Sequence, residues 1–268
     1  MPEYAFLKGH GTENDFVLLP DHDGTLHGDL SAEQLAERVR ALCDRRAGIG
    51  GDGVLRVVRD GDLWFMDYRN ADGSVSEMYG NGIRVFARYL VDAGLADPAR
   101  PIPVDTRDGL KVLTVDGDLI TADMGTPQVL GESKVGVPGH AWVARHVDMG
   151  NPHAVAFVSS LDDAGPLLDQ PSYDAGLYPQ GVNIEFVVRR GHAHVAMRVH
   201  ERGSGETRSC GTGACAAMVA AALADDAPRD TTYRVDVAGG TLSVTWTADD
   251  RVLLTGPAEI VARGTTSL

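Results

Sequence analysis

The stretch EMYGNGIRVFARYL, residues 77–90, decides the fold, because RSCGTGACAAMVAAAL repeats its pattern at residues 208–223. In both stretches a reactive side chain stands just before a G-x-G turn, and the apolar run that follows predicts a helix. The reactive side chain is the phenol of Tyr79 in the first copy and the thiol of Cys210 in the second. They are 210 − 79 = 131 positions apart in a chain of 268 residues.

The same spacing recurs around the two turns. Asn70 and Glu201 precede the reactive positions by equal distances, and 201 − 70 = 131. Gly-Thr-Pro at 125–127 and Gly-Pro at 256–257 follow the two helices, and 256 − 125 = 131. Three matches at one spacing predict an internal duplication, with two similar domains whose helix starts meet at one cleft.

The rest of the chain predicts an α+β fold. Short strand patterns with hairpin turns, such as Asp116-Gly117, surround one long helix in each half. A further helix is expected at about 32–46, where Ser31 and Gln34 form a capping-box pattern. We expect an N-terminal half-domain at 1–123, rejoined by the tail 260–268, and a C-terminal half-domain at 124–259. The stretch 131–140 is expected to be the loosest part, near the domain junction.

Composition limits the classes of function. A net charge of −14 and a pI near 4.9 argue against a nucleic-acid surface, which needs clustered Lys and Arg. No apolar stretch approaches the roughly 20 residues of a membrane span, and the N-terminus lacks a signal-peptide pattern. The sequence therefore predicts a soluble, cytoplasmic protein with neither a nucleic-acid nor a membrane partner.

The three cysteines do not form a disulfide framework. Cys43 falls on the apolar face of the first helix and Cys215 lies among alanines, so both are expected to pack as small apolar side chains. Cys210 differs because it precedes a helix start, whose free N–H groups and dipole favour a thiolate. We therefore expect Cys210 to be alkylated fastest of the three.

Two other motifs carry less weight. The turn GIGGDG at 48–53 matches G-x-G-x-x-G, but a helix pattern precedes it and a strand pattern follows, the reverse of a dinucleotide site. The nine histidines show no metal-ligand spacing, so no metal is expected. Among them, His153 is singled out because the Asn151-Pro152 turn presents it.

Polar residues in turn-rich segments accompany the two helix starts. Their side-chain amides, acid and guanidinium suit a zwitterionic substrate with carboxylate and ammonium groups, and the bare N–H groups of the helix starts suit a small anion. The residues of this set are Asn14, Asn70, Asn151, Asn183, Glu201 and Arg202.

These residues lie in segments that resemble the diaminopimelate epimerase family. The segments are KGHGTENDFVLL, GIGGDG, YRNADGS with EMYGNGIRVFA, DMGNPHAV, GVNIEF and RVHERGSGETRSCGTGACAA, and they span residues 8–217 in the family's order. The resemblance implies two pseudo-symmetric domains, each a mixed, largely antiparallel, barrel-like sheet around a central helix. It also implies epimerisation of LL- to meso-diaminopimelate without pyridoxal phosphate or another cofactor, in lysine and peptidoglycan precursor synthesis, by a dimer.

The resemblance also assigns the site residues. Two facing cysteines of the family exchange the α-proton; the second matches Cys210, whereas the first falls on Tyr79. His153 and Glu201 match the residues that tune the thiols. The amino-acid contacts match Asn14, Asn70, Asn151, Asn183, Glu201 and Arg202, and the α-carboxylate is expected at the backbone N–H groups of Gly80-Asn81 and Gly211-Thr212. Gly53 replaces the family's usual Gln.

Tyr79 leaves three interpretations open. The phenol has a reference pKa of about 10 against about 8.5 for a thiol, so at neutral pH roughly thirtyfold less of it is ionised. The chain is then an epimerase impaired by loss of one cysteine, or a diverged isomerase of a related amino acid that uses Cys210 with Tyr79. The third possibility is a non-catalytic amino-acid-binding module.

Overall fold

The computed structural model describes residues 3–75 and 80–268, so Tyr79 lies outside the described residues. The chain divides into two compact units. Unit 1 comprises Met1–Ala122 together with Pro257–Leu268, and unit 2 comprises Asp123–Gly256. None of the helices among the described residues is long and apolar enough to cross a membrane.

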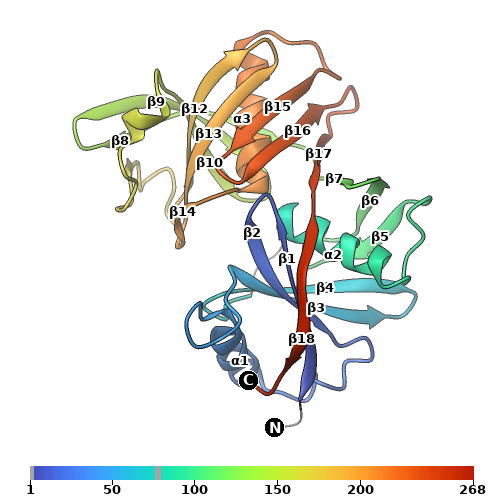
Figure 1. The fold of residues 1–268 in the computed structure, drawn as a ribbon. Coiled ribbons are helices and arrows are strands. Elements are labelled where there is room, and N and C mark those ends of the chain that lie inside the picture. Colours follow the sequence, from blue (N-terminus) through green and yellow to red (C-terminus); the bar gives the residue numbers. More distant parts are fainter. Residues whose placement is uncertain (1–2, 76–79) are drawn as a thin grey trace. The chain divides into compact units, whose positions relative to one another are not determined.

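Unit 1 is a sheet around one helix (Figure 1). The pairing order is β18-β1-β2-β3-β4-β5-β6-β7, in which β2–β3 and β4–β5 are parallel and the other neighbours antiparallel. Its elements are β1 (Tyr4–Gly11), β2 (Asn14–Pro20), α1 (Ala32–Cys43), β3 (Gly53–Asp60), β4 (Leu63–Asn70), α2 (Gly80–Asp92), β5 (Ile102–Asp105), β6 (Lys111–Asp116), β7 (Leu119–Asp123) and β18 (Glu259–Thr266). The central helix, α2, contacts β1, β2, β3, β4 and β18.

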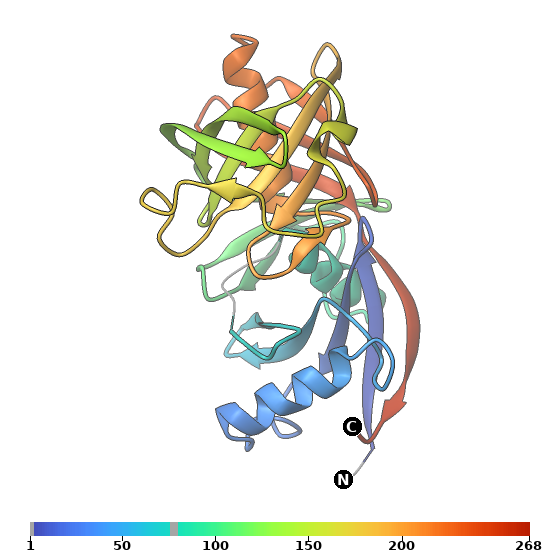
Figure 2. The ribbon, with the colours of Figure 1, turned by 90° about the vertical axis from the view of Figure 1, so that its left-hand side faces the viewer.

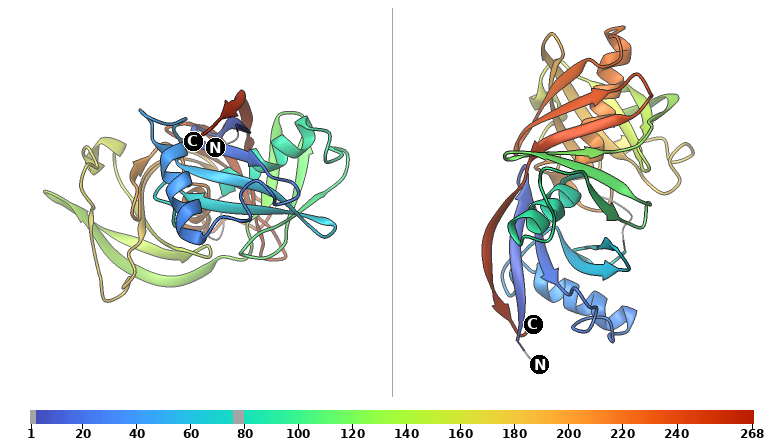
Figure 3. Two further views of the ribbon diagram at one scale, coloured as in Figure 1. Left: turned by 90° about the horizontal axis from the view of Figure 1, so that it is seen from below. Right: turned by 90° about the vertical axis from the view of Figure 1, so that its right-hand side faces the viewer.

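Helix α1 packs on β3 and β4 (Figure 3). The predicted capping box is present: Ser31 Oγ accepts from Gln34 N at 3.2 Å, and Gln34 Oε1 accepts from Ser31 N at 2.9 Å. The helix ends at Cys43, earlier than the expected 46. Asp44 Oδ1 accepts hydrogen bonds from Arg46 N and Ala47 N, both at 2.7 Å, which offers this backbone a turn instead of a further helical turn.

Removing the cap of α1 should cost stability. We expect Ser31→Ala to lower the free energy of unfolding by about 1 kcal/mol, because the N–H of Gln34 loses its acceptor. Chemical denaturation measures the change. Ser31→Asp keeps an acceptor and serves as the control, and an equal loss in both variants would contradict the capping role.

Unit 2 repeats the architecture around α3 (Figure 2). The pairing order is β8-β9-β10-β12-β13-β15-β16-β17, in which β10–β12 and β13–β15 are parallel and the other neighbours antiparallel. Its elements are β8 (Gln128–Val137), β9 (His140–Asp148), β10 (Pro152–Phe157), the 3-10 helix η1 (Leu161–Ala164), β11 (Ser172–Tyr173), β12 (Asn183–Gly191), β13 (His194–Glu201), β14 (Gly205–Thr207), α3 (Gly211–Ala224), β15 (Thr232–Val237), β16 (Gly240–Trp246) and β17 (Val252–Pro257).

The order of parallel and antiparallel pairs is therefore the same in both units. Equivalent elements also keep the spacing seen in the sequence: α2 and α3 begin at Gly80 and Gly211, and 211 − 80 = 131, while β4 and β13 begin at Leu63 and His194, and 194 − 63 = 131. The predicted α+β fold of two pseudo-symmetric sheets around central helices is confirmed. The expectation of a loose stretch at 131–140 is wrong, because these residues belong to the antiparallel β8–β9 pair, which turns at Gly139 with φ of +85°.

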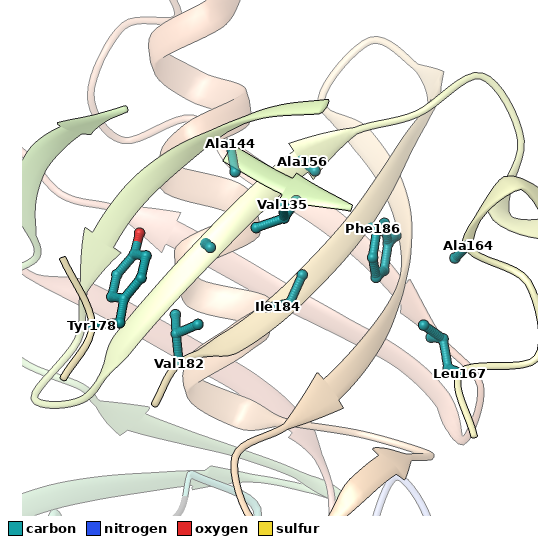
Figure 4. Close-up of a cluster of buried hydrophobic side chains, with 10 residues drawn as sticks. Val135, Ala144, Ala156, Ala164, Leu167, Tyr178, Val182, Ile184 and Phe186 are labelled. Carbon is teal, nitrogen blue, oxygen red and sulfur yellow. The ribbon is translucent and has the colours of Figure 1, made fainter. Parts of the chain in front are cut away.

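An apolar cluster fixes β10 and β12, the strands that carry the candidate site. Ala154 and Ala156 of β10 join Ile184 and Phe186 of β12 in this cluster (Figure 4). Because successive side chains of a strand point to opposite faces, His153 and Glu185 point to the other face. The cluster therefore fixes both strands while leaving their second face to the surroundings of α3.

Candidate functional site

Cys210 is the N-cap residue of α3. Its backbone is extended, with φ of −121° and ψ of 118°, and its sulfur accepts a hydrogen bond from Gly213 N at 3.4 Å. The sulfur also lies 3.5 Å from Thr212 Oγ1. The thiol thus takes the place that an N-cap hydroxyl or carboxylate usually fills, and it meets N–H and O–H groups able to stabilise negative charge.

Hydrogen bonds connect Cys210 to a buried histidine and a buried acid. Asn151 Nδ2 donates to Thr212 Oγ1 at 3.4 Å, and His153 Nε2 lies 2.9 Å from Asn151 Oδ1. On its other side the imidazole meets Glu185, with Nδ1 and Oε1 2.6 Å apart. His153 and Glu185 are both 0% exposed. We call the series Glu185, His153, Asn151, Thr212 and Cys210 the thiol chain.

The surroundings raise the pKa of the Cys210 thiol well above its usual value. Burial is the largest cause, and the negative charges of Glu201 and Glu185 add to it, while the donors Thr212 and Gly213 act in the opposite direction. The expectation that the helix start favours a thiolate is therefore corrected. The helix start supplies donors as predicted, but the loss of solvation outweighs them and favours the neutral thiol.

Glu201 and Arg202 lie where β13 ends, beside the start of β12. Glu201 is buried and its carboxylate accepts a hydrogen bond from the hydroxyl of Thr207. Asn183 Oδ1 accepts from Arg202 N at 2.9 Å, and Asn183 Nδ2 donates to Pro152 O at 3.1 Å. Asn183 therefore connects the start of β10 with the end of β13. Most of the candidate residues lie in unit 2: Asn151, His153, Asn183, Glu201, Arg202, Cys210, Gly211 and Thr212.

Unit 1 holds a smaller group at the start of α2. Asn81 Nδ2 donates to Asn14 Oδ1 at 3.2 Å, and Asn14 Nδ2 donates to Asp52 Oδ2 at 2.7 Å. Arg84, a fully buried cation, donates from Nη2 to Asn81 Oδ1 at 2.6 Å. Gly80 is buried as the first residue of α2. The structure thus brings Asn14 and Asn81 together.

Asn70 ends β4 and is held by its neighbours: Tyr68 Oη donates to Asn70 Oδ1 at 2.8 Å, and Asn70 Nδ2 donates to Ser74 Oγ at 2.9 Å.

The turn at 48–53 lies between α1 and β3, as the sequence predicts, and its Asp52 accepts a hydrogen bond from Asn14. Gly53 is the first residue of β3. The turn therefore positions a site residue.

Sequence reasoning missed four of these residues: Asp52, Arg84, the side chain of Thr212 and Glu185. For Glu185 a signal existed, because a single acid interrupts the apolar strand pattern NIEFVV, and a charge at a buried strand position needs a partner. Cys43 and Cys215 are buried in α1 and α3, as expected. Across residues 3–75 and 80–268, no group of three or more His, Cys, Asp or Glu side chains is arranged to hold a metal ion.

Gly213, the third residue of α3, has little room for a side chain. A Cβ atom there would lie 2.7 Å from Glu185 Oε1 and 3.3 Å from Cys210 Sγ. At Gly82, which holds the same place in α2, an added Cβ makes ordinary contacts, the nearest at 3.4 Å to Leu55 Cδ2.

These contacts predict opposite effects of alanine at the two glycines. Gly213→Ala should lower the free energy of unfolding by about 1–3 kcal/mol, because overpacking displaces Glu185 and Cys210. Gly82→Ala should instead raise it by about 0.5–1 kcal/mol, the ordinary gain of alanine in a helix. Denaturation of both variants measures the difference, and equal effects would contradict this geometry.

Comparisons with known proteins cover most of the chain. A family model described as Diaminopimelate epimerase matches residues 6–130 and 145–261. The diaminopimelate epimerase of Streptomyces coelicolor is 55% identical over 280 residues, covering 97% of this chain and 94% of the relative. That of Corynebacterium glutamicum strain ATCC 13032 is 46% identical, covering 97% and 96%.

Two solved structures share the fold. A PhzF-family phenazine biosynthesis protein of Bacillus anthracis has a TM-score of 0.74 at 14% identity and covers 100% of both chains. A hydroxyproline epimerase of Agrobacterium vitis with bound trans-4-OH-L-proline has a TM-score of 0.72 at 14% identity, covering 99% of this chain and 93% of the other. At such identities these structures indicate the fold alone.

Proposed function

Because the chain belongs to the diaminopimelate epimerase family, we propose that it interconverts LL- and meso-2,6-diaminopimelate by proton transfer at the α-carbon. The observation that carries the proposal is Cys210 at the start of α3, joined through the thiol chain to buried His153 and Glu185. The reaction needs neither pyridoxal phosphate nor another cofactor, because one group removes the α-proton and a second group returns a proton to the opposite face.

Cys210 is suited to both directions of the reaction. As a thiol it donates a proton to the carbanion, and the resulting thiolate meets the N–H of Gly213 and the hydroxyl of Thr212. In the reverse direction the thiolate is a strong base, because burial raises the pKa of this group. His153 and Glu201 adjust this balance through the thiol chain and through charge.

The polar residues of unit 2 suit a substrate that carries ammonium and carboxylate groups. We assign Glu201 to an ammonium group and Arg202 to a carboxylate, with Asn151 and Asn183 as amide contacts. The N–H groups of Gly211 and Thr212 start a helix and suit the α-carboxylate. From unit 1 we assign Asn14, Asn70 and the N–H groups of Gly80 and Asn81 to substrate binding.

Tyr79 stands where the family has its other cysteine, and we propose that it impairs the reaction. Loss of one positioned acid–base group typically costs about 10²–10⁴-fold in rate. Tyr79 also favours a second candidate function, an isomerase of a related amino acid that uses Cys210 with the phenol.

We further propose that the protein acts in the cytoplasm as a homodimer, and light scattering of the purified protein tests its oligomeric state.

The test of the proposed function is α-proton exchange in D₂O. LL- and meso-diaminopimelate are incubated separately with the protein, and NMR follows both deuterium incorporation and interconversion. We expect slow exchange from both isomers. If the protein exchanges the α-proton of another amino acid but not that of diaminopimelate, the second candidate is favoured. If it binds diaminopimelate without any exchange, it is a non-catalytic amino-acid-binding module.

A further inference from the structure

The two units differ in what lies beside their central helices. In unit 1, β2 and β3 pair Phe16 with Gly53 and Leu18 with Leu55, while β3 and β4 pair Val54 with Arg69. In unit 2, β10 and β12 pair His153 with Asn183 and Val155 with Glu185, while β12 and β13 pair Ile184 with His200. Since β4 and β13 are equivalent at the spacing of 200 − 69 = 131, His153 corresponds to Phe16 and Glu185 to Leu55.

The two helix starts support this correspondence independently. A Cβ added at Gly82 of α2 would meet Leu55 Cδ2 at 3.4 Å and Phe16 Cζ at 3.5 Å. A Cβ added at Gly213 of α3 would meet Glu185 Oε1 at 2.7 Å. An apolar pair therefore lies beside α2, and an ionisable pair takes its place beside α3.

The ionisable pair forms one unit that shares a proton. Burial raises the pKa of the Glu185 carboxyl, and among the described residues Glu185 Oε2 has no hydrogen-bond partner, so an isolated charge there would be costly. The proton lies between Glu185 Oε1 and His153 Nδ1. On the other side of the ring, Asn151 Oδ1 can only accept, so the hydrogen of its 2.9 Å contact with His153 Nε2 belongs to the imidazole.

That single hydrogen gives the thiol chain its direction. With Asn151 Oδ1 occupied as an acceptor, the amide Nδ2 donates to Thr212 Oγ1. The hydroxyl of Thr212, having accepted this bond, has its own hydrogen available for the sulfur of Cys210, 3.5 Å away. Hydrogen bonds that run in one direction polarise one another, so each donor strengthens the next.

We propose that Glu185 is a positioning residue for Cys210: by fixing His153 as a donor, it aligns the hydrogen bonds of Asn151 and Thr212 toward the sulfur. It touches no reacting atom and acts through the imidazole. The proposal rests on the proposed function only in taking Cys210 as the acid–base group, and Leu55 at the equivalent place of unit 1 provides no such alignment.

The charged groups around the thiol chain come from several elements. Glu201 of β13 and Glu185 of β12 act on Cys210, and His153 of β10 acts on Glu185. His153 interacts electrostatically with His146 of β9, and Glu185 interacts electrostatically with Tyr178. After burial and Glu201, the negative charge of Glu185 raises the pKa of Cys210, whereas alignment of the donors through His153 would act in the opposite direction. The sign of the change in Glu185→Gln therefore shows which of the two effects is larger.

The experiment compares Glu185→Gln with the unaltered protein. Iodoacetamide alkylation is followed from neutral to strongly alkaline pH, and fragment-ion mass spectrometry distinguishes Cys210 from Cys215 and Cys43. Glutamine can donate to or accept from His153, so the chain loses its fixed direction. We expect alkylation of Cys210 to slow about tenfold at neutral pH, a shift of its profile to higher pH by about one pKa unit. Glu206→Gln is the control, because Glu206 pairs with Arg198 and not with the thiol chain, and it should leave the profile unchanged.

A double variant tests whether a folding defect, rather than loss of alignment, explains slow alkylation in Glu185→Gln. His153→Phe with Glu185→Leu copies the pair that unit 1 already accommodates, and replacing a buried ion pair by packed apolar side chains usually preserves stability. We expect an unchanged or raised Tm together with the slow alkylation of Glu185→Gln. Unchanged or faster alkylation in either variant would overturn the proposal.

The readout also separates this inference from the proposed function, because alkylation needs no substrate. If the unaltered protein shows no α-proton exchange while Glu185→Gln slows alkylation, the proposed function fails and the positioning role stands. If exchange is present while Glu185→Gln leaves the alkylation profile unchanged, the positioning role is overturned and the proposed function stands.

Discussion

Replacing Tyr79 by cysteine is expected to raise the rate of α-proton exchange by about 10²–10⁴-fold. On the proposal that Tyr79 stands in place of a catalytic cysteine, a thiol at this position restores the second acid–base group. The reference pKa of a thiol lies about 1.5 units below that of a phenol. The measurement is NMR of diaminopimelate in D₂O, with kcat and KM determined separately.

Tyr79→Phe provides the matched control, because it keeps the ring and removes the hydroxyl. If the impaired-epimerase proposal holds, Tyr79→Phe and the unaltered protein both exchange slowly, and only Tyr79→Cys is fast. If Tyr79→Phe abolishes an already rapid exchange and Tyr79→Cys slows it, the phenol is the working group and the isomerase with a Cys210–Tyr79 pair replaces the first proposal.

Replacing Cys210 by serine should lower exchange by a similar factor, about 10²–10⁴-fold. A serine hydroxyl can still cap α3 and accept from Gly213 N, so the fold should persist while the acid–base group is lost. The loss should appear in kcat more than in KM, because the substrate contacts that we propose for Asn183 and Arg202 remain. The experiment is best performed in the Tyr79→Cys background, where exchange is fast enough to measure a large decrease.

Cys215→Ala is the control for this variant. Cys215 lies in the same helix and is fully buried among alanines, so its removal tests for a general effect of losing a thiol from α3. Exchange should be retained in Cys215→Ala. Comparable exchange in Cys210→Ser and the parent protein would exclude Cys210 as the acid–base group.

Much of the fold follows from local sequence. The capping pattern of Ser31 and Gln34 correctly predicted α1, and Asp116-Gly117 correctly predicted the turn between β6 and β7. The duplication could be recognised in the sequence because both copies have their G-x-G motif at the start of a central helix. These features depend on neighbouring residues, so a single sequence contains them. The stretch 131–140 misled because its glycines and proline suggest a loop, whereas pairing between β8 and β9 decides its structure.

The candidate site was predictable by residue type but not by partner. His153 was selected from its turn, yet its partner Glu185 comes from another strand, and only the parallel pairing of β10 with β12 brings them together. The helix start at Cys210 was visible in the sequence, but its burial was not, so the direction of its pKa shift was wrong. Burial and long-range pairing belong to the folded chain and cannot be read from spacing.

The strand β18 has a consequence for synthesis on the ribosome. It comes from the last residues of the chain and pairs with β1, among the first. Unit 2 is one continuous segment, whereas unit 1 needs Pro257–Leu268 to complete its sheet. During vectorial synthesis the domain that emerges first must therefore wait, with one edge of β1 unpaired, until the other has been made. Translation order and completion order are reversed in this protein.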